Sequence, residues 1–531
     1  MQEKLWTVST IIVIVCLSVV GTIIGLELIT SLGVTPNTSI IGALVAMIIA
    51  RIPGRIFFHF RSIHVQNLAQ TAISAATFGA ANSLLLPIAV PWAMGRPELV
   101  VPMLVGVGMA LLLDGYLVYR MFNTRVFPAT GAWPLGVATA GVIHAGDKGG
   151  RQGWLLLGGI GAGAIGAGIG IPMSSFGVAF LGNIWALTCF GIGLLINGYW
   201  TQLPFSLDFT YLVADGATAL GTQYVPHGFM IGAGIIALVQ VIMALKAKKD
   251  AAAEENDTSY ADGRIPTTLG IGAVGYMIIA VIIAVITGVY SDMSTGMLIG
   301  FILYAAFAAF VHELIVGIAA MHSGWFPAFA VALITLIIGM LIGFPPMALG
   351  VLVAFSAATG PAFADNGYDF KAGFILRKGF TTEQELVGRK AQLISSMIAF
   401  CIAIFLVGFA YDSYFMRDAM PPVARTYAST IAAGTSPEIA MKLLIWAIPG
   451  AILQFIGGAK RQIGVMLATG LLIANPLAGW AVLLGILIRF VIAKKFGSKY
   501  QSDMEVFSAG VIAGDAIYNF ITSMYNSAKA K

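Results

Sequence analysis

The sequence predicts an all-α, polytopic integral membrane protein built from two pseudo-repeated halves. Three observations support this fold class. The composition is strongly apolar over the whole length, apolar runs long enough to cross a bilayer recur along the chain, and short strings of the first half return in the second. Because a span needs ~20 helical residues, we expect about 12 to 16 transmembrane helices, some of them broken or re-entrant.

The composition is typical of a protein in a lipid membrane and has too few charged residues for the surface of a soluble protein. Of the 531 residues, 58% are hydrophobic and 10% are charged, whereas soluble proteins carry about 25% charged residues. The mean hydropathy of +0.90 requires many apolar segments. The net charge of +5 is spread over short connections without a basic stripe, which indicates loop charge on the cytoplasmic side and no nucleic-acid partner.

The cysteines and the N-terminus carry no sign of a secreted protein. Cys16, Cys189 and Cys401 lie far apart, each in an apolar run, so we expect neither a disulfide framework nor a metal site, and no cofactor. The apolar run that follows Lys4 is too long for a signal peptide and lacks a small-residue cleavage pattern. We interpret it as an uncleaved first span.

The expected spans follow the apolar runs. They lie near 8–30, 38–54, 66–90, 98–121, 153–172, 174–197, 226–246, 267–290, 293–311, 325–343, 345–361, 391–411, 437–457, 463–474 and 477–493. Three further stretches, 128–146, 203–222 and 507–524, are apolar but rich in Gly, Pro, Ser, Thr or Asp. Such segments are typical of broken or re-entrant backbone facing a protein-lined path.

One long polar stretch, 246–264, divides the chain near its middle. We therefore expect an N-terminal transmembrane half at 1–245, a polar cytoplasmic linker at 246–265 and a C-terminal transmembrane half at 266–531. The Lys and Arg residues of the linker, and those of 377–390, place both segments on the cytoplasmic side.

Short strings recur between the halves at similar offsets. They are Ser-Ala-Ala-Thr at 74–77 and 356–359, Asp215-Gly216 and Gly514-Asp515, and the Pro128 to Pro134 loop and Pro421-Pro422. Each match is short, but their agreement predicts an internal duplication around a central site.

A glycine-rich string in the first half has the spacing of a dinucleotide-binding motif but lacks the sequence context of one. Gly161, Gly163 and Gly166 have the GxGxxG spacing, but no strand precedes them and no acidic residue follows at ~20 residues. The pairs Gly159 and Gly163, and Gly166 and Gly170, instead predict close contact between membrane helices.

Enzyme motifs are incomplete throughout. His312-Glu313 resembles the start of a zinc-protease helix, yet the second histidine position is Val316. The Gly-x-Gly-Asp pattern of an aspartyl intramembrane protease fails at Ile512, before Asp515. No GxxxxGK[ST] loop occurs, so the sequence offers no direct ATP drive. We expect no catalytic residues and no enzyme.

Acidic residues in apolar surroundings are the most informative positions: Glu27, Asp114, Asp208, Asp215, Glu313, Asp365, Asp369 and Asp515. A charge at mid-bilayer costs at least ~2.5–3.5 kcal/mol, so each acid must be paired, protonated or hydrated. We expect Glu27 and Asp114 to reach the interface from helix ends. Asp208, Asp215, Asp365 and Asp515 lie in the expected broken segments, where capping or pairing is the alternative to a functional role.

One string resembles a known family. From Ala364 to Phe374 the chain is similar to the oligopeptide transporter superfamily in its yellow-stripe-like branch, which has Ser-Asp, three residues, then Asp-Phe-Lys-Thr-Gly-Tyr here. Weaker similarity covers the stretches 127–140, 205–211 and 508–516. The chain departs from the pattern at Ala362, Phe363, Ala513 and Ala516, so the resemblance leaves the substrate open.

The resemblance implies a secondary active transporter, a proton-coupled symporter that imports small oligopeptides or peptide-like molecules. The alternative is import of metal-chelate complexes, and the further alternatives are a channel and an intramembrane enzyme. We expect the inner membrane of a prokaryote as its location. Its partners would be the substrate, protons and the lipid bilayer, and a homo-oligomer stays open.

The expected cavity is lined by the broken segments 203–222, 355–373 and 507–518 and by the loop 128–144. Its substrate-facing residues are Trp200, Phe205, Asp208, Tyr211, Asp215, Asp365, Asp369, Lys371 and Asp515. A peptide needs a carboxylate for its amine and a cation for its C-terminus. The candidates for the coupled proton are Asp208, Asp215, Asp365, Asp515 and Glu313, because an apolar environment favours the neutral form of a carboxylic acid.

Overall fold

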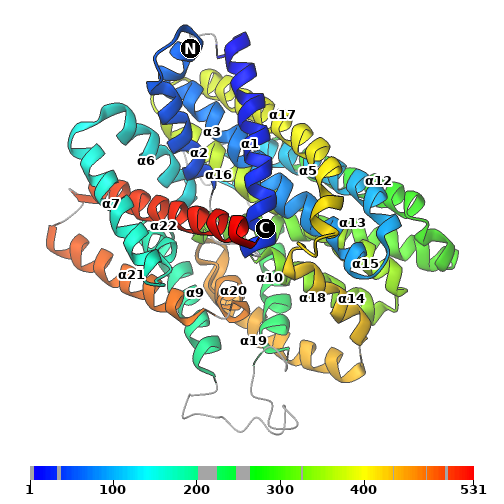
Figure 1. The fold of residues 1–531 in the computed structure, drawn as a ribbon. Helices are drawn as coiled ribbons and strands as arrows, with labels where there is room; N and C mark the ends of the chain where they lie inside the picture. Colours follow the sequence, from blue (N-terminus) through cyan, green and yellow to red (C-terminus); the bar gives the residue numbers. More distant parts are fainter. Residues whose placement is uncertain are drawn as a thin grey trace.

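The computed structural model describes most of the chain as one bundle of helices (Figure 1). It describes residues 5–32, 38–200, 220, 224–246, 263–324, 327–434, 436–473, 475–496 and 500–530. Within these residues no β-strand occurs, and Phe122 and Phe127 form an isolated bridge. The predicted all-α membrane fold is confirmed.

The described residues form helices in both halves of the chain. In the first half they are α1 (Val8–Leu32), α2 (Thr38–Arg51), α3 (Ile63–Phe78), a π-helical turn (Gly79–Leu85), α4 (Leu86–Ala93), α5 (Val100–Met121), α6 (Pro134–Lys148), α7 (Gly150–Gly168), α8 (Met173–Val178), α9 (Ile184–Tyr199) and α10 (Val225–Lys246). In the second half they are α12 (Ile265–Ile286), α13 (Thr295–Ser323), α14 (Ala328–Ile342), α15 (Pro346–Ala358), α16 (Pro361–Leu376), α17 (Thr382–Phe415), α18 (Pro422–Ala433), α19 (Pro437–Arg461), α20 (Ile463–Leu472), α21 (Pro476–Phe496) and α22 (Gln501–Ala530).

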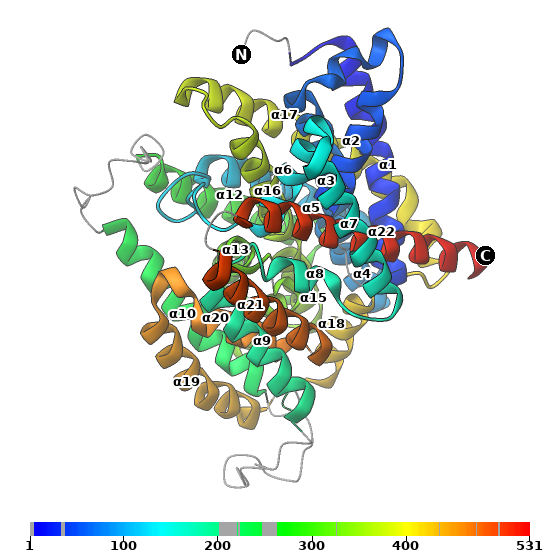
Figure 2. The same cartoon turned by 90° about the vertical axis from the view of Figure 1, so that its left-hand side faces the viewer.

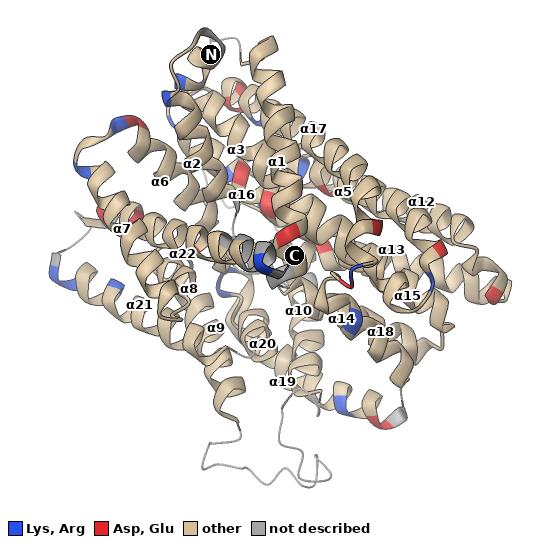
Figure 3. Ribbon diagram, in the orientation of Figure 1, with Lys and Arg blue, Asp and Glu red and all other residues tan. Residues whose placement is uncertain are grey.

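The outside of the bundle is apolar. Among the described residues, nine helices are long and apolar enough to cross a membrane, and five shorter helices are also apolar. Large side chains such as Trp154, Phe409 and Phe455 are more than two-thirds exposed, which suits lipid contact and would be costly in water. Charged positions are few and lie mainly near helix ends (Figure 3). The chain is an integral membrane protein.

Two interrupted spans lie deepest in the bundle. Ile63–Ala93 and Pro346–Leu376 are each 31 residues long, and each is 94% buried over its most apolar window. The first contains the π-helical turn between α3 and α4. The second breaks at Thr359 and Gly360, between α15 and α16, as the sequence predicts for the segment 355–373. Gly360 has φ 91, a conformation that favours glycine.

Helices from the first half of the chain also pack against helices from the second half. Helix α7 packs along α22, and α10 packs along α19 (Figure 2). Each pair joins one helix from before the linker to one from after it. The expected duplication would produce such reciprocal pairing, because α7 and α19 hold similar places in the order of the two halves, as do α10 and α22. The duplication and the three-part division of the chain stay predictions.

Glycines set the contact between α7 and α22. A Cβ on Gly159 would collide with the Phe507 carbonyl, and one on Gly163 would collide with the Val511 backbone. This confirms the predicted close packing of the first glycine pair. The prediction is wrong for the second pair: Gly166 lies against the Met173 side chain, and Gly170 is in the turn after α7 with φ 85.

The expectation that 507–524 is broken is also wrong. These residues lie inside one continuous helix, α22. Its Gly510 and Gly514 face the α7 backbone, where an added Cβ would collide with the carbonyl oxygens of Leu156 and Ile160. The glycines of this stretch therefore serve close helix packing and leave the helix unbroken.

Candidate functional site

A buried polar seam runs between α3 and α16. On α3, Gln66, Gln70 and Ser74 are spaced by four residues and therefore share one face. On α16, Asp365 and Asp369 have the same spacing. All five side chains are buried, with at most 4% of their surface exposed. Two helices of a membrane protein thus face each other with amide, hydroxyl and carboxyl groups.

Hydrogen bonds run across this seam in register. The Ser74 hydroxyl donates to Asp365, with distances of 2.7 and 2.9 Å to its two oxygens, and the Gln70 side-chain amide donates to Asp369. Ser39 on α2 lies 2.7 Å from the Ser74 hydroxyl. Because a step of four residues up α3 matches a step of four residues down α16, the two helices run antiparallel.

Several polar atoms of the seam have no protein partner. In the described residues these are the Gln66 and Gln70 side-chain oxygens, both amide atoms of Asn67 and Asn366, one Asp369 oxygen, the Tyr368 hydroxyl and the Gln392 oxygen. Buried polar atoms are normally hydrogen-bonded, and each exception costs ~1–3 kcal/mol. Such a set of free donors and acceptors is chemically suited to a peptide-like ligand, which offers amide groups of both kinds.

A loop closes one side of α16. The Lys371 ammonium donates to the carbonyl oxygens of Ala129 and Gly131 at 2.7 and 2.9 Å. Trp133, at the end of this loop, is fully buried and donates through its indole N–H to the Pro128 carbonyl at 3.0 Å. Lys371 therefore holds the loop in place here, and in this arrangement its donors point at backbone oxygens.

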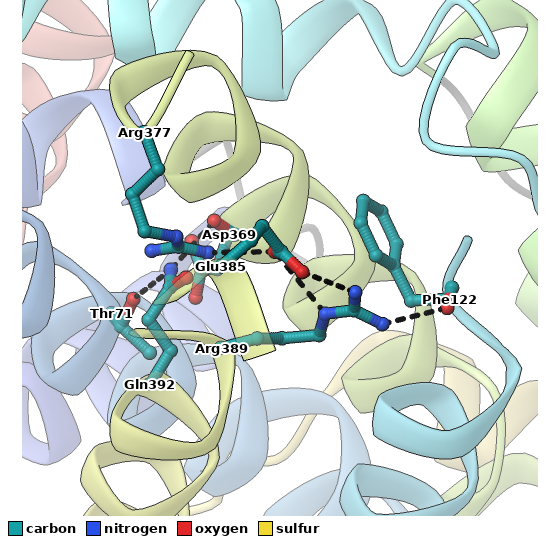
Figure 4. A network of polar contacts seen from close by, with 7 residues as sticks. All are labelled: Thr71, Phe122, Asp369, Arg377, Glu385, Arg389 and Gln392. Atoms are coloured by element: carbon teal, nitrogen blue, oxygen red, sulfur yellow. Dashed lines mark hydrogen bonds and ion pairs between the residues drawn. The ribbon is translucent and has the colours of Figure 1, made fainter. Parts of the chain in front are cut away.

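Two arginines and one glutamate fix the turn between α16 and α17 (Figure 4). Arg377 lies 3.2 Å from Glu385, and Arg389 bonds both the second oxygen of Glu385 and the Phe122 carbonyl, the latter at 2.9 Å. Burial lowers the pKa of Arg377, and the Glu385 carboxylate opposes that shift. One turn along α17, Gln392 donates to the Asp369 carbonyl at 2.7 Å.

A third cluster joins α5, α12 and α13. The Tyr276 hydroxyl lies 2.5 Å from Asp114 and 2.8 Å from Glu313. The second Asp114 oxygen accepts the Gly360 N–H at 2.7 Å. All three side chains are fully buried. The expectation that Asp114 reaches the interface is therefore wrong: it lies inside the bundle, where the tyrosine and the backbone N–H satisfy it.

The other predicted site residues lie apart from the seam or outside the described residues. Asp515 on α22 accepts the Ser174 hydroxyl at 2.5 Å, at the start of α8. Glu27 accepts the Tyr414 hydroxyl at 2.8 Å. Trp200 follows α9 and is partly buried against the cluster around Leu220. Phe205, Asp208, Tyr211 and Asp215 lie outside the described residues. Of the predicted residues, Asp365 and Asp369 thus share the seam with α3, and Lys371 contacts the loop at Ala129 and Gly131.

Sequence reasoning missed the groups that complete these clusters. Ser39, Gln70 and Tyr276 lie in apolar spans, and polar uncharged residues draw less notice there than acids do. A signal was present: α3 carries Gln66, Asn67 and Gln70 within two turns of an otherwise apolar span.

The described residues hold no group of three or more His, Cys, Asp or Glu side chains that could bind a metal ion. An apolar multi-helix bundle with a polar seam between its two most buried spans is the architecture of a membrane transport protein.

Comparison with known proteins gives the family. A family model described as OPT oligopeptide transporter protein matches residues 5–169 and 153–526. The chain belongs to the oligopeptide transporter family and is a transporter of the peptide type. No curated protein matches the chain.

Proposed function

We propose that this protein is a proton-coupled secondary importer of small oligopeptides or peptide-like molecules. The observation that carries the proposal is the α3–α16 seam, where carboxyl groups lie beside amide donors and acceptors that have no partner within the described part of the chain. Asp365 and Asp369 would receive the substrate amine, and the free amides would bond its backbone. The absence of a nucleotide-binding loop from the sequence supports a gradient as the energy source.

The alternative is import of a metal-chelate complex by a member of the yellow-stripe-like branch. The resemblance supports it, because five residues match that branch in identity and spacing: Asp365, Asp369, Phe370, Lys371 and Gly373. In this case the chelator would make the contacts assigned above to the peptide, and the carboxylates would lie near the metal. We further propose that the protein works in the inner membrane of a prokaryote.

Transport by purified protein in proteoliposomes tests the function. We expect labelled trialanine to accumulate when an inward acid gradient is imposed, and we expect a protonophore to abolish the acceleration. Counterflow of unlabelled trialanine should speed the entry of the labelled peptide, which a channel or an enzyme would not do. Accumulation of a ferric chelate in place of the peptide would favour the alternative. Uptake that follows only a sodium gradient would contradict proton coupling.

A further inference from the structure

The cluster of Asp114, Tyr276 and Glu313 lies away from the α3–α16 seam and contains two close contacts between oxygen atoms. If both acids were ionised, the cluster would hold a single proton, on the tyrosine hydroxyl, for these two contacts. Tyr276 has one hydroxyl proton and lies within hydrogen-bond distance of Asp114 and Glu313 at once. That proton can be donated to one carboxylate only. The second close oxygen pair requires a proton on the other carboxyl group, so this cluster binds one proton in the observed arrangement.

The geometry tells which acid carries that proton. The 2.5 Å distance from Tyr276 to Asp114 is in the range of a hydroxyl bonded to a carboxylate, and the 2.8 Å distance to Glu313 matches two neutral groups. Asp114 also accepts the Gly360 N–H at 2.7 Å, at the N-terminus of α16 where the helix dipole favours negative charge. The other Glu313 oxygen has no hydrogen-bond partner among the described residues. Asp114 is thus the ion, and Glu313 is the acid that donates to the Tyr276 oxygen.

Glu313 interacts with two ionisable side chains, Asp114 on α5 and Tyr276 on α12. No further ionisable side chain interacts with it among the described residues. Its neighbour His312 turns elsewhere: one ring nitrogen lies 2.7 Å from the Ala328 carbonyl and the other 3.4 Å from the Thr359 hydroxyl. Helices α14, α15 and α20 carry no ionisable residue. The remaining helices packed on α13 carry, at described positions, His144, Asp147, Lys148, Cys189, Tyr199, His227, Asp365, Tyr368, Asp369 and Lys371.

The cluster is linked to the seam through the break between α15 and α16. Gly360 bonds Asp114, and Thr359 lies beside His312, so both sides of the break are held by α5 and α13. Asp365 follows five residues later, about 7.5 Å along the helix axis. Loss of the Glu313 proton would leave two carboxylates around one tyrosine hydroxyl, and their repulsion would act on the helix end that Asp114 holds.

From these contacts we propose that Glu313 binds the transported proton, in a one-proton cluster with Tyr276 and Asp114, and that its charge state acts on the substrate seam through the N-terminus of α16. The transport part of this inference rests on the proposed function. The binding of the proton by the cluster does not.

Infrared spectroscopy of the purified protein near neutral pH tests the cluster without any substrate. We expect a protonated-carboxyl band that is lost in Glu313→Gln, a shape-conserving change that also keeps a donor for the tyrosine oxygen. In Tyr276→Phe the band should shift, because the Glu313 acid loses its acceptor. Asp412→Asn, at an exposed acid of α17, should leave the band as in the wild type. Protonated-carboxyl absorption that is the same in Glu313→Gln as in the wild type, or that does not change in folded Tyr276→Phe, would overturn the cluster.

Proteoliposome uptake of labelled trialanine tests the coupling. In wild-type protein an inward acid gradient should raise the initial rate, and in Glu313→Gln the gradient should no longer change it. If Glu313→Gln still responds to the gradient like the wild type, the coupling role is wrong. If the wild type takes up no trialanine under any gradient, the proposed function fails for this peptide, and the infrared result still decides the cluster.

Discussion

Single residues show how this bundle holds polar groups in an apolar interior. Asp365 is satisfied by serine hydroxyls, Asp114 by a tyrosine and a backbone N–H, and Glu385 by two arginines. The sequence predicts that Asp365 is buried and needs partners, because charges are costly in the membrane. It could not predict the partners, since Ser74 and Ser39 approach Asp365 only when three helices have packed together.

We expect Asp365→Asn to reduce trialanine uptake at least about tenfold while membrane abundance stays near that of the wild type. The asparagine oxygen still accepts the Ser74 hydroxyl, so the fold is kept, but a charge-assisted contact to substrate of ~1.5–3 kcal/mol is lost. Initial uptake rates in proteoliposomes, normalised to protein content, measure the effect. Asp412→Asn is the control. Loss of the folded protein in detergent would instead make Asp365 a structural residue.

Asp515 calls for a different substitution series, because it bonds Ser174 at the start of α8. The sequence-based hypothesis is that Asp515→Asn abolishes uptake and leaves abundance unchanged. We expect that result if the charge matters, whereas a purely structural contact would be kept by Asn, which retains an acceptor, and lost in Asp515→Ala at a cost of ~1 kcal/mol. Normal uptake by Asp515→Asn together with a lower melting temperature of Asp515→Ala would make Asp515 structural.

At the level of helices, the sequence predicts most spans and locates the break in 355–373, where Pro361 and Gly360 interrupt an apolar run. It fails for 507–524, because glycine has two opposite uses. In Gly360 it permits a positive φ, and in Gly510 and Gly514 it permits contact with another backbone inside a straight helix. Composition alone does not separate these uses, since the second depends on α7, which lies more than three hundred residues earlier.

The α7–α22 contact predicts that alanine substitutions at two neighbouring glycines of α7 differ in their effect on stability. Gly163→Ala places a Cβ against the Val511 backbone and should destabilise the protein by about 1–3 kcal/mol through overpacking. Gly161→Ala, two residues earlier on the same helix, meets no atom of the described residues within 4 Å and should be neutral or slightly stabilising. Thermal unfolding in detergent compares the two. Equal melting temperatures would contradict the close contact.

The α16–α17 turn offers a second test at this scale. Glu385→Gln leaves Arg377 and Arg389 buried without a counter-charge, and removing one partner of a buried ion pair costs about 3–5 kcal/mol. We expect a lower melting temperature and poor recovery in the membrane. Glu383→Gln removes an exposed acid from the first turn of the same helix and should change neither quantity. If both variants behave alike, the ion pairs contribute little to the fold.

At the level of the whole molecule, the two interrupted spans are the most buried of the candidate spans in the described residues, and the other apolar helices are more exposed. This arrangement places the polar seam on one side of α16 and the cluster of Asp114, Tyr276 and Glu313 at its N-terminus. Movement of this helix end would therefore connect the proposed substrate binding with the proposed proton binding. The predicted duplication would give the bundle its reciprocal pairs, α7 with α22 and α10 with α19.

The charge of the linker predicts the topology of the first half. We expect the N-terminus and the 246–264 linker to face the cytoplasm, because the linker is rich in Lys and Arg. An even number of crossings must then separate them. Three long candidate spans and three shorter apolar helices precede the linker in the described residues, and six crossings would return the chain to its starting side.

In a variant whose three native cysteines are replaced by serine, a cysteine at Ser259 should react with a membrane-impermeant maleimide only after the cells are permeabilised. A cysteine at Gln2 should behave in the same way, since both positions would lie on one side. Labelling of one position but not the other in intact cells would contradict the six-crossing arrangement of the first half. Labelling of both positions would place both segments outside and contradict the predicted cytoplasmic orientation.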